Sequence, residues 1–328
     1  MGNPVAIGAL LTQGIRNNFA MSYQSRYASV MSDINEVIAE TTSDKISELY
    51  GAMQSALHPI RWPAETVIPS KGILSLQYRV QNRDFGRRVY LPRNYTDDQT
   101  GSVMSVARRL GYNWTFLPER LFFQYITNTT DNDLLMSIPT SADGNALYIS
   151  TTRYGSANGN VVTQTGTATV QAIITDVFSI VRRFAEFQDT EGQPFWPADV
   201  VKREGINLFY GTSLTLAMVQ AEKQALTALA ASTATSNAGI SNTIINSGFN
   251  IKFVPSQRIT DASYYTFLRN QPEELRPLIR QVRKGMTEAQ GNYATSDVSR
   301  DTGEEYVQFD SREGWGSFTA IGTIRASA

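Results

Sequence analysis

The sequence predicts an α+β fold, and three of its stretches carry that prediction. Residues 73–80 alternate apolar and polar side chains, which is typical of a half-buried strand. Residues 103–125 repeat apolar side chains at helical spacing, which indicates a long helix. Residues 206–210 form a short apolar stretch ahead of a second helical pattern at 213–231. A strand followed by a helix suits an α+β or an α/β layer, and the elements follow one another irregularly and without an internal repeat.

The first 45 residues are rich in Asn, Ser, Gln and Thr, with sparse apolar side chains. Between Phe19 and Ile38 these apolar side chains recur mostly every three or four residues, which places them on one face of a helix. The helix is either the ordinary first helix of a domain or an arm that packs on a neighbouring subunit. Composition favours neither alternative.

The alternating stretch at 73–80 is followed by a polar segment at 81–84 and by a second alternating stretch at 85–91, which Pro92 ends. We therefore predict a β-hairpin. A two-stranded ribbon is only marginally stable in water, so it needs a surface to pack on. In proteins generally that surface is more often a larger sheet of the same domain than a partner.

The helix predicted at 103–125 has candidate capping residues at Thr96, Asp97 and Asp98. We expect Gly111 and Pro118 to interrupt or kink it. The two adjacent aspartates also suggest acid–base chemistry or a metal. Capping and the helix dipole explain them more simply.

The rest of the chain alternates between loops and further elements. Residues 139–168 and 231–243 are rich in small polar residues and glycine, and we expect loops there. The remaining predictions are a helix at 170–184 that ends at the turn 191–197, strands at 249–254 and 263–268, a strand or short helix at 277–286, and two β-segments around a glycine-rich turn at 304–326.

Composition excludes several classes of function. The chain has no cysteine, so it has no disulfide, thiolate metal site or cysteine nucleophile. Its single histidine, His58, cannot build a multi-histidine metal site. The 29 basic and 30 acidic residues leave a net charge of -1, which argues against strong nucleic-acid binding. Arginine outnumbers lysine by 23 to 6, a weak indication of protein interfaces because the guanidinium fork suits fixed pairing with carboxylates.

Motifs for catalysis are also lacking. The sequence contains no phosphate loop, no strand-linked dinucleotide fingerprint and no nucleophile elbow. The carboxylate pairs Asp131 with Asp133 and Glu273 with Glu274 lie in polar stretches, where solvated charge is the simplest interpretation. No stretch approaches the length of a membrane span and the start is a poor signal peptide. We expect a cytoplasmic, soluble chain when it is made, with no catalytic, cofactor or metal site.

Four stretches, in this order, resemble the major head subunit family of Mu-like tailed bacteriophages. The most specific is YRVQNRDFGRRVYLPRNYTDDQTG at 78–101, which is similar to the family's basic and aromatic turn and its acidic pair before a helix. The others are TTSDKISELYG at 41–51, RPLIRQVRK at 276–284 and EEYVQFDSREGWGSFTAIGT at 304–323. In the first of these, Tyr50 departs from the family's usual Trp-Leu-Gly pattern. Their shared order carries the resemblance.

The resemblance implies the Hong Kong 97 type phage capsid fold. The segments it implies are an N-terminal arm at 1–60, an extended hairpin loop at 61–95, a peripheral domain with a long spine helix at 96–165, an axial domain at 166–290, and C-terminal β-segments at 291–328 that return to the peripheral domain.

The resemblance also implies a major capsid protein, which is found in the host cytoplasm before assembly and in the virion head afterwards. Its expected partners are further copies of itself in hexamers and pentamers, a portal, a scaffold and a decoration protein, with only weak contact to packaged DNA. Interface candidates are Lys71, Arg79, Arg87, Arg88, Asp97 and Asp98. Two alternatives stay open: a cytoplasmic enzyme that uses carboxylates, and an encapsulin-like cargo compartment with the same fold.

Overall fold

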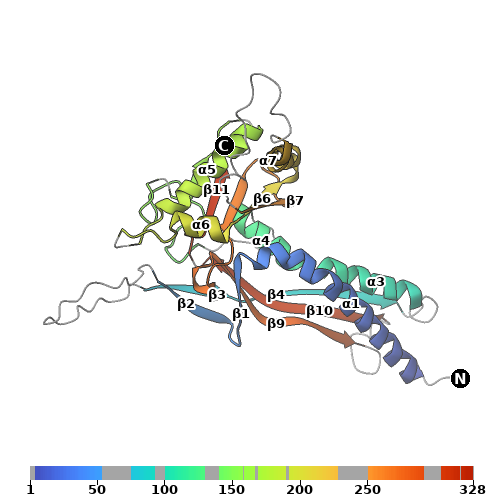
Figure 1. The fold of residues 1–328 in the computed structure, drawn as a ribbon. Helices are drawn as coiled ribbons and strands as arrows, with labels where there is room; N and C mark the ends of the chain where they lie inside the picture. The colour runs from blue at the N-terminus through green and yellow to red at the C-terminus, as the bar shows by residue number, and fades with distance from the viewer. Residues whose placement is uncertain are drawn as a thin grey trace.

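The computed structural model describes residues 4–53, 75–92, 100–129, 140–157, 159–166, 169–189, 192–227, 250–291, 304–317 and 319–327. They form a long four-stranded sheet, a five-stranded sheet and a two-stranded ribbon, with helices against both larger sheets (Figure 1). Mixed helix and strand in separate units confirms the predicted α+β class.

The helices are α1 (Pro4–Asn35), α3 (Thr100–Trp114), α4 (Leu117–Thr127), α5 (Val170–Glu186), α6 (Ala198–Glu204) and α7 (Thr215–Thr227), with 3-10 turns at Thr212–Leu214 and Glu273–Leu275. The strands are β1 (Ile38–Thr42), β2 (Ser47–Met53), β3 (Ser75–Gln81), β4 (Arg83–Pro92), β5 (Val161–Thr163), β6 (Ile206–Gly211), β7 (Ile251–Ser256), β8 (Tyr264–Leu268), β9 (Leu278–Gly291), β10 (Glu304–Ser317) and β11 (Thr323–Ser327).

The four-stranded sheet has the order β1-β9-β10-β4, and α1 and α3 lie side by side along it (Figure 1). α1 contacts the sheet where the ring of Phe19 stacks on that of Phe309 in β10, with ring centroids 3.9 Å apart. Val103 and Ala107 of α3 complete this small core. The apolar stripe of the first helix is therefore covered within the same chain. α3 and β10 cover its N-terminal part around Phe19, and α4 shares a second core with Met31 and Ile34.

The predicted helix at 103–125 is two helices. α3 ends at Trp114 and α4 begins at Leu117. Between them, the hydroxyl of Thr115 donates to the carbonyl oxygen of Tyr112 at 2.6 Å. Pro118 lies in the first turn of α4, where a missing N–H costs nothing. Gly111 instead lies inside α3, pressed against the backbone of Phe19.

The five-stranded sheet has the order β5-β11-β8-β6-β7. All six residues of β6 are buried, which confirms the strand predicted at 206–210. α5 confirms the helix predicted at 170–184, and the hydroxyl of Thr169 caps it by accepting from the Ala172 N–H at 3.2 Å. α6 was not predicted, because seven residues are too few to show a helical period.

The predicted hairpin at 73–91 is wrong in its pairing, although both strands exist. β3 pairs antiparallel with β2, while β4 pairs antiparallel with β10. The polar segment between them is no turn, because Asn82 is fixed to the β1–β2 connection. Its backbone N–H donates to the Ile46 carbonyl at 2.9 Å and its side-chain amide to the Lys45 carbonyl at 2.7 Å. The chain therefore runs on from one strand into the other.

The two C-terminal strands, β10 and β11, do not pair with each other. β10 lies between β9 and β4 in the four-stranded sheet, whereas β11 lies between β5 and β8 in the five-stranded sheet. The two C-terminal β-segments therefore lie in different sheets of the described residues. β9, most of which was expected within the axial segment 166–290, is hydrogen-bonded to β10 and belongs to the four-stranded sheet.

Candidate functional site

The ribbon of β2 and β3 lies at the end of the four-stranded sheet that is opposite the N-terminus (Figure 1). Its inner face is anchored, because Tyr78 and Val80 pack on β10 where Gly314 and Gly316 leave room for them. A Cβ at Gly316 would come within 2.5 Å of the Tyr78 ring. On the outer face, Leu49 is 60% exposed. The ribbon thus holds one face to its own chain and presents the other outward.

Of the predicted interface residues, Arg79 lies on this outer face. It is exposed, and its Nε donates to the Ser47 hydroxyl of the opposite strand at 2.8 Å. Within the described ranges no acidic side chain forms an ion pair with Arg79. Lys71, Asp97 and Asp98 lie outside the described residues, as does His58.

Arg87 and Arg88 are neighbours on β4, so their side chains point to opposite faces of the sheet. Arg88 is held by its own chain: its Nη2 donates to Gln308 Oε1 at 2.7 Å, and its guanidinium lies 4.3 Å from the centre of the Tyr306 ring. Arg87 lies on the side of α3 and lines a groove of about 830 Å³ between that helix and β4. The structure therefore separates two residues that the sequence treated as one group.

β4 is also an edge strand of the described sheet. Its ten residues pair with β10 on one side only. No backbone hydrogen bond joins its outer edge to another residue in the described part of the chain. An exposed edge of this length is a ready site for pairing with another chain.

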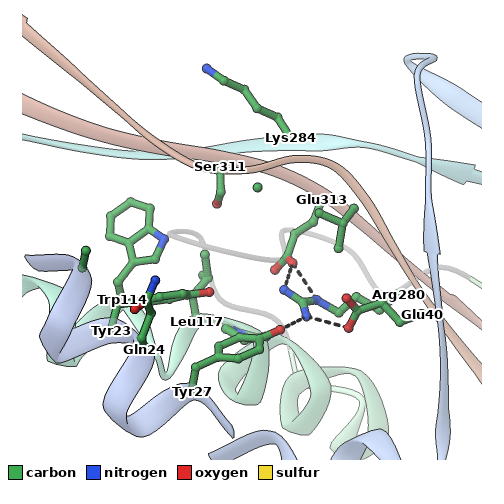
Figure 2. A pocket seen from close by; sticks show the side chains of 14 residues that line it. Tyr23, Gln24, Tyr27, Glu40, Trp114, Leu117, Arg280, Lys284, Ser311 and Glu313 are labelled. Atoms are coloured by element: carbon green, nitrogen blue, oxygen red, sulfur yellow. Dashed lines mark hydrogen bonds and ion pairs between the residues drawn. The ribbon is translucent and has the colours of Figure 1, made fainter.

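A second feature is a cleft of about 380 Å³ between α1 and the four-stranded sheet (Figure 2). At its floor, Arg280 is buried with Glu313: its Nη2 and Nε lie 2.7 and 2.8 Å from Glu313 Oε2. Its Nη1 lies 3.1 Å from Glu40 Oε2 and also donates to the Tyr27 hydroxyl. α1, β1, β9 and β10 each supply one member of this cluster.

The protonation of the cluster is set by burial and by its charges. Burial alone would lower the pKa of Arg280, but Glu313, Tyr27 and Glu40 outweigh it and hold that pKa above its usual value. Burial raises the pKa of Tyr27 and of its neighbour Tyr23, so both phenols stay protonated at neutral pH. Both carboxylates bind one guanidinium, an arrangement that neutralises a buried charge and does not set apart an acid and a base.

The other acidic pairs considered from sequence give no catalytic arrangement within the described residues. Glu273 is exposed in a 3-10 turn, whereas Asp131, Asp133 and the side chain of Glu274 lie outside them. In the same residues no group of three or more His, Asp or Glu side chains is placed to hold a metal ion. Among the described helices, none has the length and apolar character needed to cross a membrane.

The sequence analysis missed the cluster around Arg280. A signal for it was present, because Leu278, Arg280 and Val282 share one face of their strand. A charged side chain between two apolar ones on a buried face requires a partner. Its partner Glu313 is 33 residues away in sequence, and no spacing pattern connects the two.

The family model described as the Mu-like prophage major head subunit gpT matches residues 12–134. That match covers most of α1, the ribbon, β4, α3 and α4. A search of curated protein sequences gives no match.

Solved structures with a similar fold include phage capsids. The capsid of cyanophage P-SCSP1u is 12% identical, with 90% of this chain and 87% of that chain covered and a TM-score of 0.52. The mature capsid of bacteriophage PhiM1 is 8% identical, with 88% of this chain and 84% of that chain covered and a TM-score of 0.54. The capsid of Ralstonia phage GP4 is 14% identical, with 88% of this chain and 86% of that chain covered and a TM-score of 0.51. The chain therefore has the Hong Kong 97 type capsid fold, and residues 12–134 carry the sequence pattern of the Mu-like major head subunit family.

Proposed function

We propose that this chain is the major capsid protein of a tailed bacteriophage, and that it self-assembles into the icosahedral head shell around packaged double-stranded DNA. The family match over residues 12–134 carries this proposal. The likeness of the fold to phage capsids over about nine tenths of the chain supports it. The role is structural and non-enzymatic.

The geometry supports assembly in three places. The ribbon exposes its outer face, with Leu49 and Arg79, at one end of the four-stranded sheet. The edge of β4 offers unpaired backbone groups, and Arg87 lines the groove beside it. Surfaces of different kinds on one subunit suit the repeated heterologous contacts of a closed lattice.

In the proposed subunit, the arm is 1–60, the extended loop 61–95, the peripheral domain 96–165 and the axial domain 166–290, followed by the segments at 291–328. Strand pairing supports two adjustments. The extended loop includes β2 as well as β3, because these two strands form the ribbon. β4 and β9 are assigned to the peripheral domain together with the rest of the four-stranded sheet, because both strands pair with β10.

The proposed partners are further copies in hexamers and pentamers, a portal, a scaffold and a decoration protein. DNA on the inner face is contacted weakly, in line with a net charge of -1. The chain is made in the host cytoplasm and ends in the virion head. Lys71, Asp97 and Asp98 remain interface candidates.

Sedimentation velocity and negative-stain electron microscopy test the proposal on protein that is co-expressed with its scaffold. Hexamers, pentamers or closed shells are expected. Protein that stays monomeric at all concentrations, with and without scaffold, contradicts the proposal. Nuclease-resistant double-stranded DNA in particles taken from the host distinguishes a phage head from a cargo compartment of the same fold.

A further inference from the structure

The cleft under α1 is built like a binding site for one side chain. Its floor is buried and consists of Pro118, Arg280, Ser311 and Glu313. Half-buried aromatic and apolar side chains form the walls, and exposed residues form the rim (Figure 2). The walls include Tyr23, Tyr27, Trp114, Leu117 and Val282, and the rim includes Gln24, Glu40 and Lys284.

Two polar atoms of the floor have no hydrogen-bond partner among the described residues. Both contacts of Arg280 with Glu313 fall on Oε2, so Glu313 Oε1 is left over although the residue is only 3% exposed. The Ser311 hydroxyl is likewise buried and without a partner. In Figure 2 it points into the cleft. Because a buried polar group without a partner is costly, such atoms indicate a ligand that supplies donors.

The charge of the cleft selects the kind of donor. Glu40 and Glu313 carry two negative charges against the one positive charge of Arg280, which leaves one negative charge in excess. Lys284 does not cancel it, since its ammonium lies 2.7 Å from Asp310 and points away from the cleft in Figure 2. A cation is therefore favoured.

Among cations, the aromatic walls of the cleft favour a guanidinium. A guanidinium is planar, stacks on aromatic faces and carries several donors, so it can lie against Tyr23 and Trp114 while it donates to Glu313 Oε1 and the Ser311 hydroxyl. The space of about 380 Å³ accommodates a single long side chain. This chain carries 23 arginines and only 6 lysines.

We propose that this cleft receives an arginine side chain from a second copy of the chain, so that each subunit holds a guanidinium of its neighbour beneath α1. The inference rests on the proposed self-assembly and adds to it a defined contact. The guanidinium completes the hydrogen bonds of the floor only in the assembled state.

A pair of serine substitutions in one strand tests the contact. Ser311→Ala removes a hydroxyl without a partner, so the free subunit should unfold at the same denaturant concentration as the wild type or a higher one. The concentration for half-assembly should rise about tenfold, since the lost bond is to a charged group. Ser317→Ala is the control, because its buried hydroxyl is already bonded to Ser141 at 2.7 Å, and it should weaken the subunit more than the assembly.

Photo-crosslinking identifies the occupant. Gln24→p-benzoylphenylalanine places the crosslinker on the exposed rim, and particles are assembled from a 1:1 mixture of nitrogen-14 and nitrogen-15 subunits. Mass spectrometry should find crosslinks that join differently labelled chains through an arginine-containing peptide. They should be absent from free subunits.

The outcomes separate this inference from the proposed function. If wild-type protein forms shells but Ser311→Ala assembles equally well, or if crosslinks form only within one chain, the inference is wrong and the capsid role stands. If the wild type forms no assembly with its scaffold, the proposed function itself fails.

Discussion

At the scale of single residues, Arg280 is a buried cation whose charge must be balanced by its neighbours. It is 6% exposed and joins α1, β1 and β10 through Tyr27, Glu40 and Glu313. Arg280→Met leaves Glu313 buried without its cation and should lower the free energy of unfolding by about 3–5 kcal/mol. The double variant Arg280→Met with Glu313→Leu should recover much of that loss, as urea denaturation would show. A double variant no more stable than the single one contradicts the assigned pairing.

The contacts of Glu36 should make the free energy of unfolding depend on pH. Glu36 lies just after α1 and reaches the five-stranded sheet, where Asn207 donates to it at 2.8 Å and Arg269 lies 3.1 Å away. Burial alone would raise the pKa of Glu36, but these donors and Lys252 outweigh it and hold the pKa below its usual 4.5. The stability that depends on ionised Glu36 is therefore complete above about pH 4.5 and is lost as the pH falls through the lower native pKa.

Glu36→Gln should accordingly lower the free energy of unfolding at pH 7 by about 1–3 kcal/mol. The difference from wild type should shrink as the pH falls below about 4.5, because the carboxyl group of the unfolded chain then takes up a proton, and it should vanish once the folded carboxylate is protonated at its lower pKa. Denaturant titrations at pH 7 and pH 3.5 measure both values. Asp44→Asn, at an exposed position in the β1–β2 connection, is the control. A difference that does not change with pH would argue against this role.

At the scale of elements, the packing of α1 on α3 depends on Gly111. A Cβ there would meet the Phe19 carbonyl oxygen at 2.5 Å, and a backbone atom cannot move aside alone. Gly111→Ala should therefore push the helices apart and cost about 1–3 kcal/mol. Gly14→Ala is the matched control, because there the nearest atom is the flexible end of Met104 and alanine favours the helix. Thermal unfolding should rank Gly111→Ala clearly below Gly14→Ala, and equal midpoints would contradict the close approach.

β4 supports a separate prediction, because its adjacent arginines Arg87 and Arg88 face opposite ways. Arg88→Glu breaks contacts with Gln308 and Tyr306 in its own chain, so it should lower the unfolding midpoint of the subunit. Arg87→Glu, in the open groove beside α3, should leave that midpoint unchanged and reduce the yield of particles several-fold. Thermal unfolding and sedimentation of each variant measure the two effects. The reverse pattern would show that the interface lies on the other face of the sheet.

The same element shows how far the sequence alone reaches. Alternation found β3 and β4, because side-chain periodicity is local. It did not find their partners, because β2 and β10 are chosen by contacts such as those of Asn82 with Ile46 and Lys45. The cluster around Arg280 was missed for the same reason: its members come from four distant elements. The interface candidates Arg79, Arg87 and Arg88 were found by residue type, but their separate faces required the structure.

At the scale of the whole molecule, the central claim is that the ribbon and the edge of β4 find their partners on neighbouring subunits. The ribbon is held to β10 through Tyr78 and Val80 and lies at the end of the four-stranded sheet that is opposite the N-terminus (Figure 1). Its outer face carries exposed Leu49 beside Arg79. Surfaces of this kind gain most of their stabilisation when another subunit covers them.

A cryo-electron-microscopy reconstruction of particles formed with the scaffold tests this claim most directly. We expect a closed icosahedral shell in which each β2–β3 ribbon lies on an adjacent subunit and the edge of β4 is covered. Particles in which the ribbon contacts only its own subunit, or the absence of any ordered particle, would contradict the account.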